Sequence, residues 1–146
     1  MNFRLIIDPN REEETVVYAH ARTPLTDQLE RLIAQSAAPD KIAAYAQDEV
    51  KMLPLTHIEC ITVLDGKTWA IDTHNRRYQL KQRLYELEEK LPGYFIRINK
   101  STIANENQLE KFTSGFSGAV DAVFKCGYTD YVSRRCFALI KRRYGL

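Results

Sequence analysis

Two short segments in the second half of the chain carry the residue types best suited to binding a polyanion. One runs over residues 95–105 and reads FIRINKSTIAN, and the other runs over residues 132–135 and reads VSRR. The first alternates like a half-buried strand and then breaks at Asn99-Lys100-Ser101, polar residues suited to a loop that contacts phosphate. In the second, Arg134 and Arg135 directly follow a serine that can cap a helix, so both guanidinium groups can project together. These patterns favour a surface for nucleic acid over a catalytic site.

The remaining chemically active residues indicate no enzyme. The three histidines, at positions 20, 57 and 74, lack ligand-like spacing, so no metal site is expected. Cys60, Cys126 and Cys136 form no CxxC pair and are expected to be reduced packing thiols, with a redox pair of Cys126 and Cys136 as the alternative. No nucleophile is paired with a base, and no glycine loop could cradle a phosphate. We therefore expect no catalysis, no cofactor and no small-molecule substrate.

Composition and charge are those of a globular protein with a basic second part. Of the 146 residues, 45% are apolar and 27% charged, which argues against long disorder. The first residues lack the apolar stretch of a signal peptide, so a cytoplasmic protein is expected. Residues 1–54 hold 6 Lys/Arg and 9 Asp/Glu, a net −3, whereas residues 55–146 hold 15 and 10, a net +5. Only the second part therefore favours a polyanionic partner.

The first fifty residues predict a small α+β unit, which we place at residues 1–49. Strands are expected at 3–7 and 15–21, on either side of a turn at Asp8-Pro9-Asn10. Thr23 as N-cap and Pro24 as the first helical residue predict a helix that ends near residue 35. After a break at 37–40, strands over 42–46 and 50–55 are expected to be joined tightly at residues 48–49.

From residue 57 the pattern changes to β-hairpins. Strands at 58–64 and 68–73 flank Asp65-Gly66, a dipeptide that supplies the positive φ of a tight turn, and Lys67 lies at its tip. A turn at 74–76 leads to a strand at 78–80 and then to a helix. The apolar stripe of that helix is predicted to consist of four leucines, Leu80, Leu84, Leu87 and Leu91.

The last third of the chain predicts further strands and one terminal helix. A strand is expected over 94–98, a turn over 103–106, and a strand or short helical turn over 109–113. Hairpins through 115–118, 120–125 and 128–132 follow, with glycines at the reversals. Ser133 is expected to cap a final helix with an apolar inner face of Phe137, Ile140 and Tyr144. The predicted fold class is α+β, mostly β.

Four segments in this order resemble the LytTR family of bacterial DNA-binding domains. They are AIDTHNRRYQL at the end of a hairpin, the helix LYELEEKLP, the run FIRINKSTIAN and the closing TDYVSRRCFALIK. The resemblance covers residues 50–146, and the order of four segments is more specific than any single motif. It implies an elongated, mostly β domain that binds double-stranded DNA through loops inserted into successive major grooves, with little use of a recognition helix. Members of this family regulate transcription.

The resemblance also places the DNA contacts on three loops. These are the first hairpin, the loop after the arginine-bearing strand, and the residues after the serine before the last helix, which correspond to Lys67, Lys100 and Arg135, with Asn99 and Arg134 as neighbours. A guanidinium such as that of Arg135 can contact guanine O6 and N7 together or clamp a phosphate. Structural alternatives are a solvated turn lysine at 67, a turn-closing amide at 99 and a helix-surface arginine at 135. For Arg97, two roles remain open, a phosphate contact and an internal ion pair.

The chain departs from the family in two ways. Asn99 stands where the family usually has histidine, and the first fifty residues are too few for the receiver domain of a response regulator. The short extension resembles that of small regulators encoded beside a small membrane protein, so a membrane-bound antagonist is an expected partner besides DNA and a second protomer. The alternative function is a non-enzymatic module whose basic face binds an acidic protein or a membrane surface.

Overall fold

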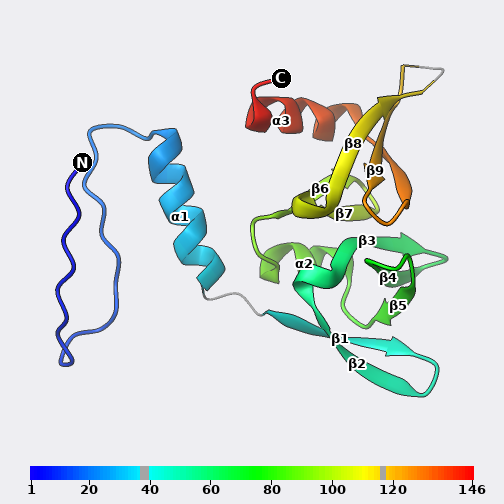
Figure 1. Ribbon diagram of the computed structural model, residues 1–146, viewed down its shortest axis with the longest axis horizontal. Coiled ribbons are helices and arrows are strands. Elements are labelled where there is room, and N and C mark those ends of the chain that lie inside the picture. The colour runs from blue at the N-terminus through cyan, green and yellow to red at the C-terminus, as the bar shows by residue number, and fades with distance from the viewer. Residues whose placement is uncertain (37–39, 116–117) are drawn as a thin grey trace.

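Apolar residues at alternate strand positions separate into two cores, one on each face of a seven-stranded antiparallel sheet. The computed structural model describes residues 1–36, 40–115 and 118–146. The order of strands across the large sheet is β2-β1-β5-β4-β3-β7-β6 (Figure 1). These strands are β1 (Lys41–Ala46), β2 (Glu49–Pro54), β3 (Ile58–Leu64), β4 (Lys67–Asp72), β5 (Arg77–Leu80), β6 (Phe95–Asn99) and β7 (Thr102–Asn105).

A smaller sheet and three helices complete the described part of the chain. The order of its strands is β10-β9-β8, which comprise β8 (Leu109–Ser114), β9 (Val120–Phe124) and β10 (Thr129–Val132). The helices are α1 (Pro24–Ser36), α2 (Leu84–Lys90) and α3 (Arg134–Tyr144), and short 3-10 turns span Leu55–His57 and Glu106–Gln108. None of the described helices is long and apolar enough to cross a membrane. The fold is therefore mostly β, as the sequence predicts.

The two cores share strand β3, because successive side chains of a strand point to opposite faces of its sheet. Ile61 packs in the first core with Leu84 and Leu87 of α2. Cys60, its neighbour in sequence, packs in the second core, where Phe124 of β9 and Ile140 of α3 are also buried. The small sheet and α3 thus cover one face of the large sheet, and α2 covers the other.

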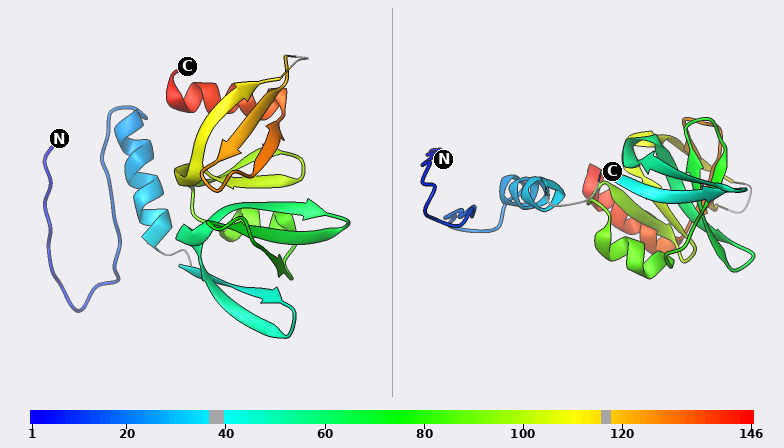
Figure 2. Two further views of the ribbon diagram at one scale, coloured as in Figure 1. Left: turned by 45° about the vertical axis from the view of Figure 1, so that its right-hand side comes forward. Right: turned by 90° about the horizontal axis from the view of Figure 1, so that it is seen from below.

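Strand directions bring two turns to the same end of the large sheet. β3 pairs antiparallel with β7, and β7 pairs antiparallel with β6, so β3 and β6 run in the same direction. The β3–β4 and β6–β7 turns, each of which follows one of these strands, therefore lie at one end, on the right of Figure 1. Two further views in Figure 2 show the same arrangement. This end of the sheet carries two of the three predicted DNA-contacting loops.

Local signals predict several elements correctly. α1 begins at Pro24, and the hydroxyl of Thr23 accepts a hydrogen bond from the backbone N–H of Thr26 at 3.3 Å. The hydroxyl of Ser133 likewise accepts one from the backbone N–H of Cys136 at 3.2 Å and caps α3. Each capping oxygen satisfies a backbone donor that the first helical turn leaves unpaired.

Four predicted features are wrong. Residues 1–23 form no strand, because the runs 3–7 and 15–21 have no strand beside them with which to pair. Residues 102–105, predicted in part as a turn, are the buried strand β7. Leu80 ends β5, as predicted for the strand over 78–80, but it is not part of the helix, because α2 starts only at Leu84. Of the other predicted connections, residues 37–39 and 116–117 lie outside the described part of the chain.

The predicted boundary between residues 49 and 50 falls at a hairpin of the large sheet. β1 pairs with β2 along its whole length, and Tyr45 of β1 lies opposite Gln79 of β5. The Leu53 and Ala44 side chains are fully buried in the first core. Residues 41–46, which the sequence prediction assigned to the extension, therefore contribute a strand to the large sheet.

Candidate nucleic-acid interface

Lys67 lies just past the two-residue turn between β3 and β4. Asp65 and Gly66 have φ values of 53° and 74°, the left-handed conformation that a two-residue hairpin needs at both central positions. Glycine adopts this conformation without strain, and aspartate tolerates it better than most residues. Lys67 then pairs with Leu64 across the hairpin, and its side chain is exposed. The turn thus presents an ammonium group at the end of the sheet.

Lys100 lies in the β6–β7 turn, which is fastened to the neighbouring strand. The side-chain oxygen of Asn99 accepts a hydrogen bond from the backbone N–H of Ser101 at 2.8 Å and so closes the turn. The carbonyl oxygen of Ser101 accepts another from the backbone N–H of Val63 in β3 at 2.9 Å. Because β3 leads directly to the Lys67 hairpin, this bond holds the two lysine-bearing turns in a fixed relation. Lys100 itself is exposed.

The start of α3 is attached to the same end of β6. The backbone N–H of Ser133 donates to the carbonyl oxygen of Ile98 at 2.8 Å, and the side-chain nitrogen of Asn99 donates to the carbonyl oxygen of Tyr131 at 2.8 Å. Arg134 and Arg135 follow in the first turn of α3, and both are exposed. The two arginines therefore project from a backbone that is anchored beside the Lys100 turn.

A chain of polar side chains runs behind these loops. The hydroxyls of Thr62 in β3 and Thr102 in β7 lie 2.8 Å apart, and that of Thr102 donates to Asp130 Oδ2 in β10 at 2.6 Å. Both threonines are buried, so the contacts are shielded from water. Asp130 also accepts from the backbone N–H of Tyr131 at 2.8 Å. The network joins the strands that carry all three loops, and no motif in the sequence identified it.

The four predicted cations have no ion-pair partner in the described structure, a property that they share with other basic residues such as Arg142. Within the described residues, no carboxylate pairs with Lys67, Lys100, Arg134 or Arg135. By contrast, three arginines after residue 50 are held in ion pairs, Arg97 with Glu88 at 3.7 Å, Arg143 with Glu106 at 2.6 Å and Arg76 with Asp72 at 3.0 Å. Arg97 therefore follows the ion-pair alternative. Their lack of such partners leaves the four cations available for an external anion.

Asn99 departs from the predicted set of contact residues. Only 1% of its surface is exposed, and both ends of its amide bind inside the protein, to Ser101 and to Tyr131. Such an amide can orient the neighbouring loops, but it does not reach solvent. Asn105 is similar, because it is buried and donates to the carbonyl oxygen of Ile58 at 2.9 Å. Asn99 thus follows the structural alternative of closing a turn through its side chain, and Asn105 likewise accepts a hydrogen bond from the backbone N–H of Asn107 at 3.0 Å.

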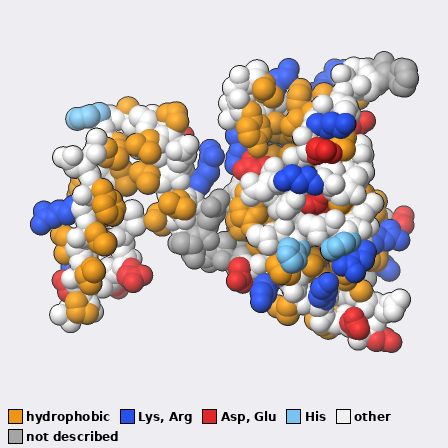
Figure 3. All heavy atoms as spheres, viewed as in Figure 1, with side chains coloured by type: hydrophobic (Ala, Val, Ile, Leu, Met, Phe, Trp, Pro, Cys, Tyr) orange, Lys and Arg blue, Asp and Glu red, His pale blue; other side chains and the backbone are white. Residues whose placement is uncertain are grey.

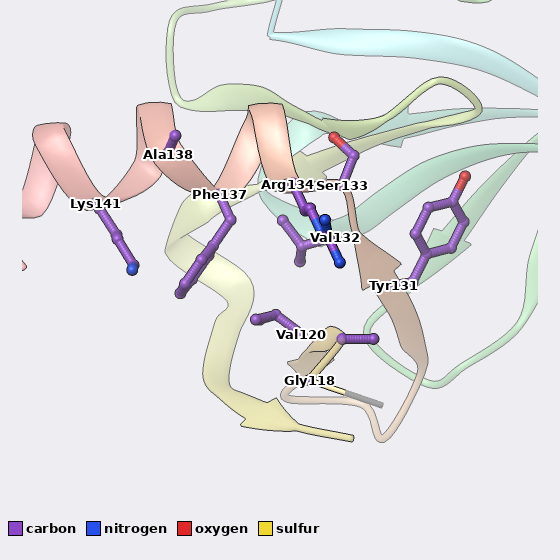
Figure 4. Close-up of a pocket in the computed structure, with 10 residues that line it drawn as sticks. Gly118, Val120, Tyr131, Val132, Ser133, Arg134, Phe137, Ala138 and Lys141 are labelled. Atoms are coloured by element: carbon purple, nitrogen blue, oxygen red, sulfur yellow. The ribbon is translucent and has the colours of Figure 1, made fainter. Parts of the chain in front are cut away.

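A groove of about 680 Å³ adjoins the predicted contact residues (Figure 4). It lies between α3 and the β9–β10 strands, with Val120 and Val132 in its floor and Phe137 along the helix. Arg134 and Lys141 line it from the same face of α3, because residues three, four and seven apart share a helix face. That spacing was visible in the sequence, but the facing strands were needed to define the groove.

The cysteines and histidines form no additional site in the described residues. Cys60 is buried, and burial raises the pKa of its thiol well above the ordinary value; burial also raises the pKa of the Cys126 thiol. Both effects keep the thiols protonated and poorly reactive. Redox pairing of Cys126 with Cys136 stays a prediction. Among the residues that the structure describes, no cluster of His, Cys, Asp or Glu could hold a metal ion.

Comparisons with known proteins identify the family and the fold. Residues 48–145 match the family of LytTr DNA-binding domains. A solved LytTr DNA-binding domain of a response regulator from Bacillus cereus has a similar fold, with a TM-score of 0.68 and 20% sequence identity, over 75% of this chain and 100% of that chain.

The chain is also similar to full-length proteins of the same size. An uncharacterized HTH-type transcriptional regulator from Staphylococcus aureus strain NCTC 8325 / PS 47 is 33% identical over 146 residues, which span 98% of this chain and 97% of that protein. A second such regulator, from strain MSSA476, is 32% identical over the same shares. With the family match over two thirds of its length and these relatives, the chain belongs to the LytTr DNA-binding domain family.

Proposed function

We propose that the chain is a sequence-specific transcriptional regulator that binds double-stranded DNA through loops in successive major grooves. The observation that carries this proposal is the set of four exposed cations, free of carboxylate partners among the described residues, at two turns of the large sheet and the first turn of α3, which backbone and side-chain hydrogen bonds hold together. Phosphates attract such cations regardless of sequence and set the register of a protein on the duplex, whereas base edges provide specificity. The names of the relatives, which call them transcriptional regulators, support the regulatory part.

Different roles are proposed for the individual side chains. Arg135 and Lys100 read bases, since a guanidinium can contact guanine O6 and N7 together and a lysine can reach the same acceptors. Lys67 and Arg134 contact phosphates on either side. Asn99 is reassigned from contact to support, because its buried amide fixes the Lys100 turn against the approach to α3.

Two further partners belong to the proposal. One such domain reads little DNA, so two protomers on repeated half-sites are expected to bind together, and linked binding raises the overall affinity. The resemblance to small regulators encoded beside a membrane protein suggests a small membrane-bound antagonist as the source of regulation. Neither a cofactor nor a small-molecule substrate is part of the proposed function.

Salt titration tests whether the ligand is a duplex. Random-pool selection first supplies a bound sequence, and its affinity is then measured against salt concentration. The logarithm of affinity should fall with the logarithm of salt by about 0.9 per neutralised phosphate. Binding to acidic protein or anionic vesicles with no enrichment of any duplex would instead support the interaction-module alternative and contradict the proposal.

Substitution of Arg135 tests the reading of bases. Arg135→Ala should weaken binding to the selected sequence by about 1 to 3 kcal/mol while changing binding to random duplex much less. Arg142→Ala is the matched control, because Arg142 is also an exposed arginine of α3 but lies two helical turns further from the loops. If Arg135→Ala weakens binding to both duplexes equally, Arg135 contacts phosphate only.

A further inference from the structure

Residues 1–36 expose more large apolar side chains than the rest of the described chain together. Phe3, Leu5 and Ile7 are 89%, 72% and 86% exposed, and Tyr18 is 92% exposed. In Figure 3, orange side chains extend over the whole of this segment, on the left of the view. A monomeric soluble protein rarely exposes apolar surface on this scale, so a surface of this kind normally has a binding partner.

The backbone before α1 also pairs in no sheet of the described structure. Residues 3–7 and 12–20 form two extended legs that reverse at residues 8–11, where the backbone N–H of Arg11 donates to the carbonyl oxygen of Asp8 at 3.4 Å. Neither leg belongs to a strand in the described structure. Phe3, Leu5 and Ile7 nevertheless lie at alternate positions, as on one face of a strand, and Ile6 between them adds a further exposed apolar side chain. A lone two-stranded hairpin is barely stable in water, whereas further strands or a covering helix stabilise it.

The adjoining helix α1 also exposes apolar side chains that lack a covering surface. α1 carries Leu25 and Leu32, which are 47% and 61% exposed, on its apolar side. Arg22, just before the helix, forms ion pairs with Asp27 at 2.8 Å and with Glu30, so the turn from the second leg into α1 is fixed. The two extended legs and α1 thus form one small unit of 36 residues. Units of fewer than about 40 residues usually need oligomerisation, a metal or disulfides to fold, and this segment holds no cysteine or metal cluster.

We propose that residues 1–36 complete their fold with the same residues of a second copy of this chain. Two copies supply four legs and two helices, enough for a sheet with one apolar face and helices to cover it. The segment holds 4 Lys/Arg and 6 Asp/Glu, a net −2, so its charge does not favour anionic lipid or DNA as the partner. Its charges also suit self-pairing, because Arg4 lies in the first leg and Glu12, Glu13 and Glu14 begin the second.

Two observations favour a second copy over the chain's own DNA-binding part. α1 spans 13 residues, about 20 Å from its first residue to its last, and Figures 1 and 2 show both legs beside α1, on its side away from the two sheets. The family match begins only at residue 48, yet the similarity to the Staphylococcus aureus regulators spans 98% of the chain. The segment is therefore shared with full-length regulators as a unit additional to the DNA-binding domain. This inference names the interface of the proposed dimer.

Mass in solution without DNA tests the proposal. Sedimentation velocity of the full chain should give a mass near twice that of one 16.9-kDa chain. Leu5→Asp and Leu25→Asp should each raise the dissociation constant of the dimer by about 100-fold or more, as substitutions at the centre of an interface do. Met52→Asp and Tyr85→Asp are matched controls, because both side chains are exposed apolar groups outside the segment, on β2 and α2, and both variants should stay dimeric.

Fluorescence of Trp69, the single tryptophan, checks that each variant still folds, because Trp69 lies in β4 of the DNA-binding part. A monomer at every concentration of the unmodified chain overturns the proposal. So does dissociation by Met52→Asp, which would place the interface on the edge strand β2, or dimers that survive both substitutions in the segment. Failure of the DNA proposal can be distinguished from failure of the dimer proposal. A monomeric Leu5→Asp chain keeps its cationic loops, so it should still show salt-dependent binding to one half-site.

Discussion

Asn99 and Tyr131 are joined by a hydrogen bond of 2.8 Å from the side-chain nitrogen of Asn99 to the carbonyl oxygen of Tyr131. The oxygen of the same amide closes the turn that carries Lys100, through the backbone N–H of Ser101. Tyr131 in turn precedes the residues that begin α3. The separation of Lys100 from Arg135 therefore depends on a residue that is itself buried.

The buried amide and the exposed lysine beside it should respond oppositely to substitution. Asn99→Ala leaves a backbone carbonyl and a backbone N–H without their partner, which should lower the free energy of unfolding by about 1 to 3 kcal/mol. Lys100→Ala should leave stability within about 0.5 kcal/mol of the unmodified protein and lower the affinity for duplex DNA. Urea denaturation and fluorescence anisotropy measure the two quantities. Equal stability of both variants would show that the amide does not hold the turn.

Loss of the central hydroxyl of the polar network should destabilise the protein. Thr102→Val keeps the shape of the side chain but leaves Thr62 and Asp130 without their shared partner, a change expected to cost about 1 to 3 kcal/mol. Thr129→Val is the control, because Thr129 is exposed on β10 and valine suits a strand. Thermal unfolding measures the difference in stability between the two variants. No difference is expected if water already supplies the hydrogen bonds of the Asp130 carboxylate.

Two substitutions of Ser133 should separate helix capping from DNA binding. Ser133→Ala removes the acceptor for the backbone N–H of Cys136 and should cost about 1 kcal/mol of stability. Ser133→Asp keeps an acceptor and should restore most of that loss, yet it adds a negative charge directly before Arg134 and Arg135. We therefore expect Ser133→Asp to be stable but weaker in DNA binding than Ser133→Ala. The reverse order of affinities would argue against DNA at this loop.

Acid should weaken one turn of the large sheet. Although burial acts to raise it, the pKa of Asp72 is lowered below 3.8 by the backbone N–H groups of Arg76 and His74 and by the Arg76 guanidinium. A lowered folded-state pKa stabilises the protein above the unfolded value, and this contribution is lost as the pH falls through the folded value. Asp72→Asn should therefore cost about 1 kcal/mol at pH 7 and progressively less as the pH falls below 3.8.

The control for this experiment is Asp65→Asn, in the neighbouring hairpin turn. Asparagine adopts the same left-handed conformation, so the stability of this variant should match that of the unmodified protein at pH 7. Urea denaturation at pH 7 and at pH 3 measures both variants. A constant difference between Asp72→Asn and the unmodified protein at both pH values would show that the ionised carboxylate does not stabilise the turn.

Elements with local causes were predictable from the sequence. Thr23 and Ser133 cap helices, and Asp65-Gly66 forms a tight turn, because each of these depends only on residues within a few positions. The positions of Lys67, Lys100 and Arg135 on exposed loops followed from the same signals together with the family resemblance. Local chemistry was thus enough to place the cations, but not to show which of them are already paired.

Elements that depend on distant partners were not predictable. Strand β7 contains Asn105, which favours a turn in isolation but is buried here because it donates to the carbonyl oxygen of Ile58, 47 residues away. Asn99 was assigned to the surface because nothing in its own loop reveals the carbonyl oxygen of Tyr131. The runs at 3–7 and 15–21 have the pattern of strands, but pattern alone supplies no neighbour with which to pair.

β3 contributes Ile61 to one core and Cys60 to the other. If either core unfolds, β3 is therefore disturbed and the packing of the other core is disrupted as well. The large sheet, the small sheet, α2 and α3 should consequently melt in a single cooperative transition, with no intermediate in which one core survives alone.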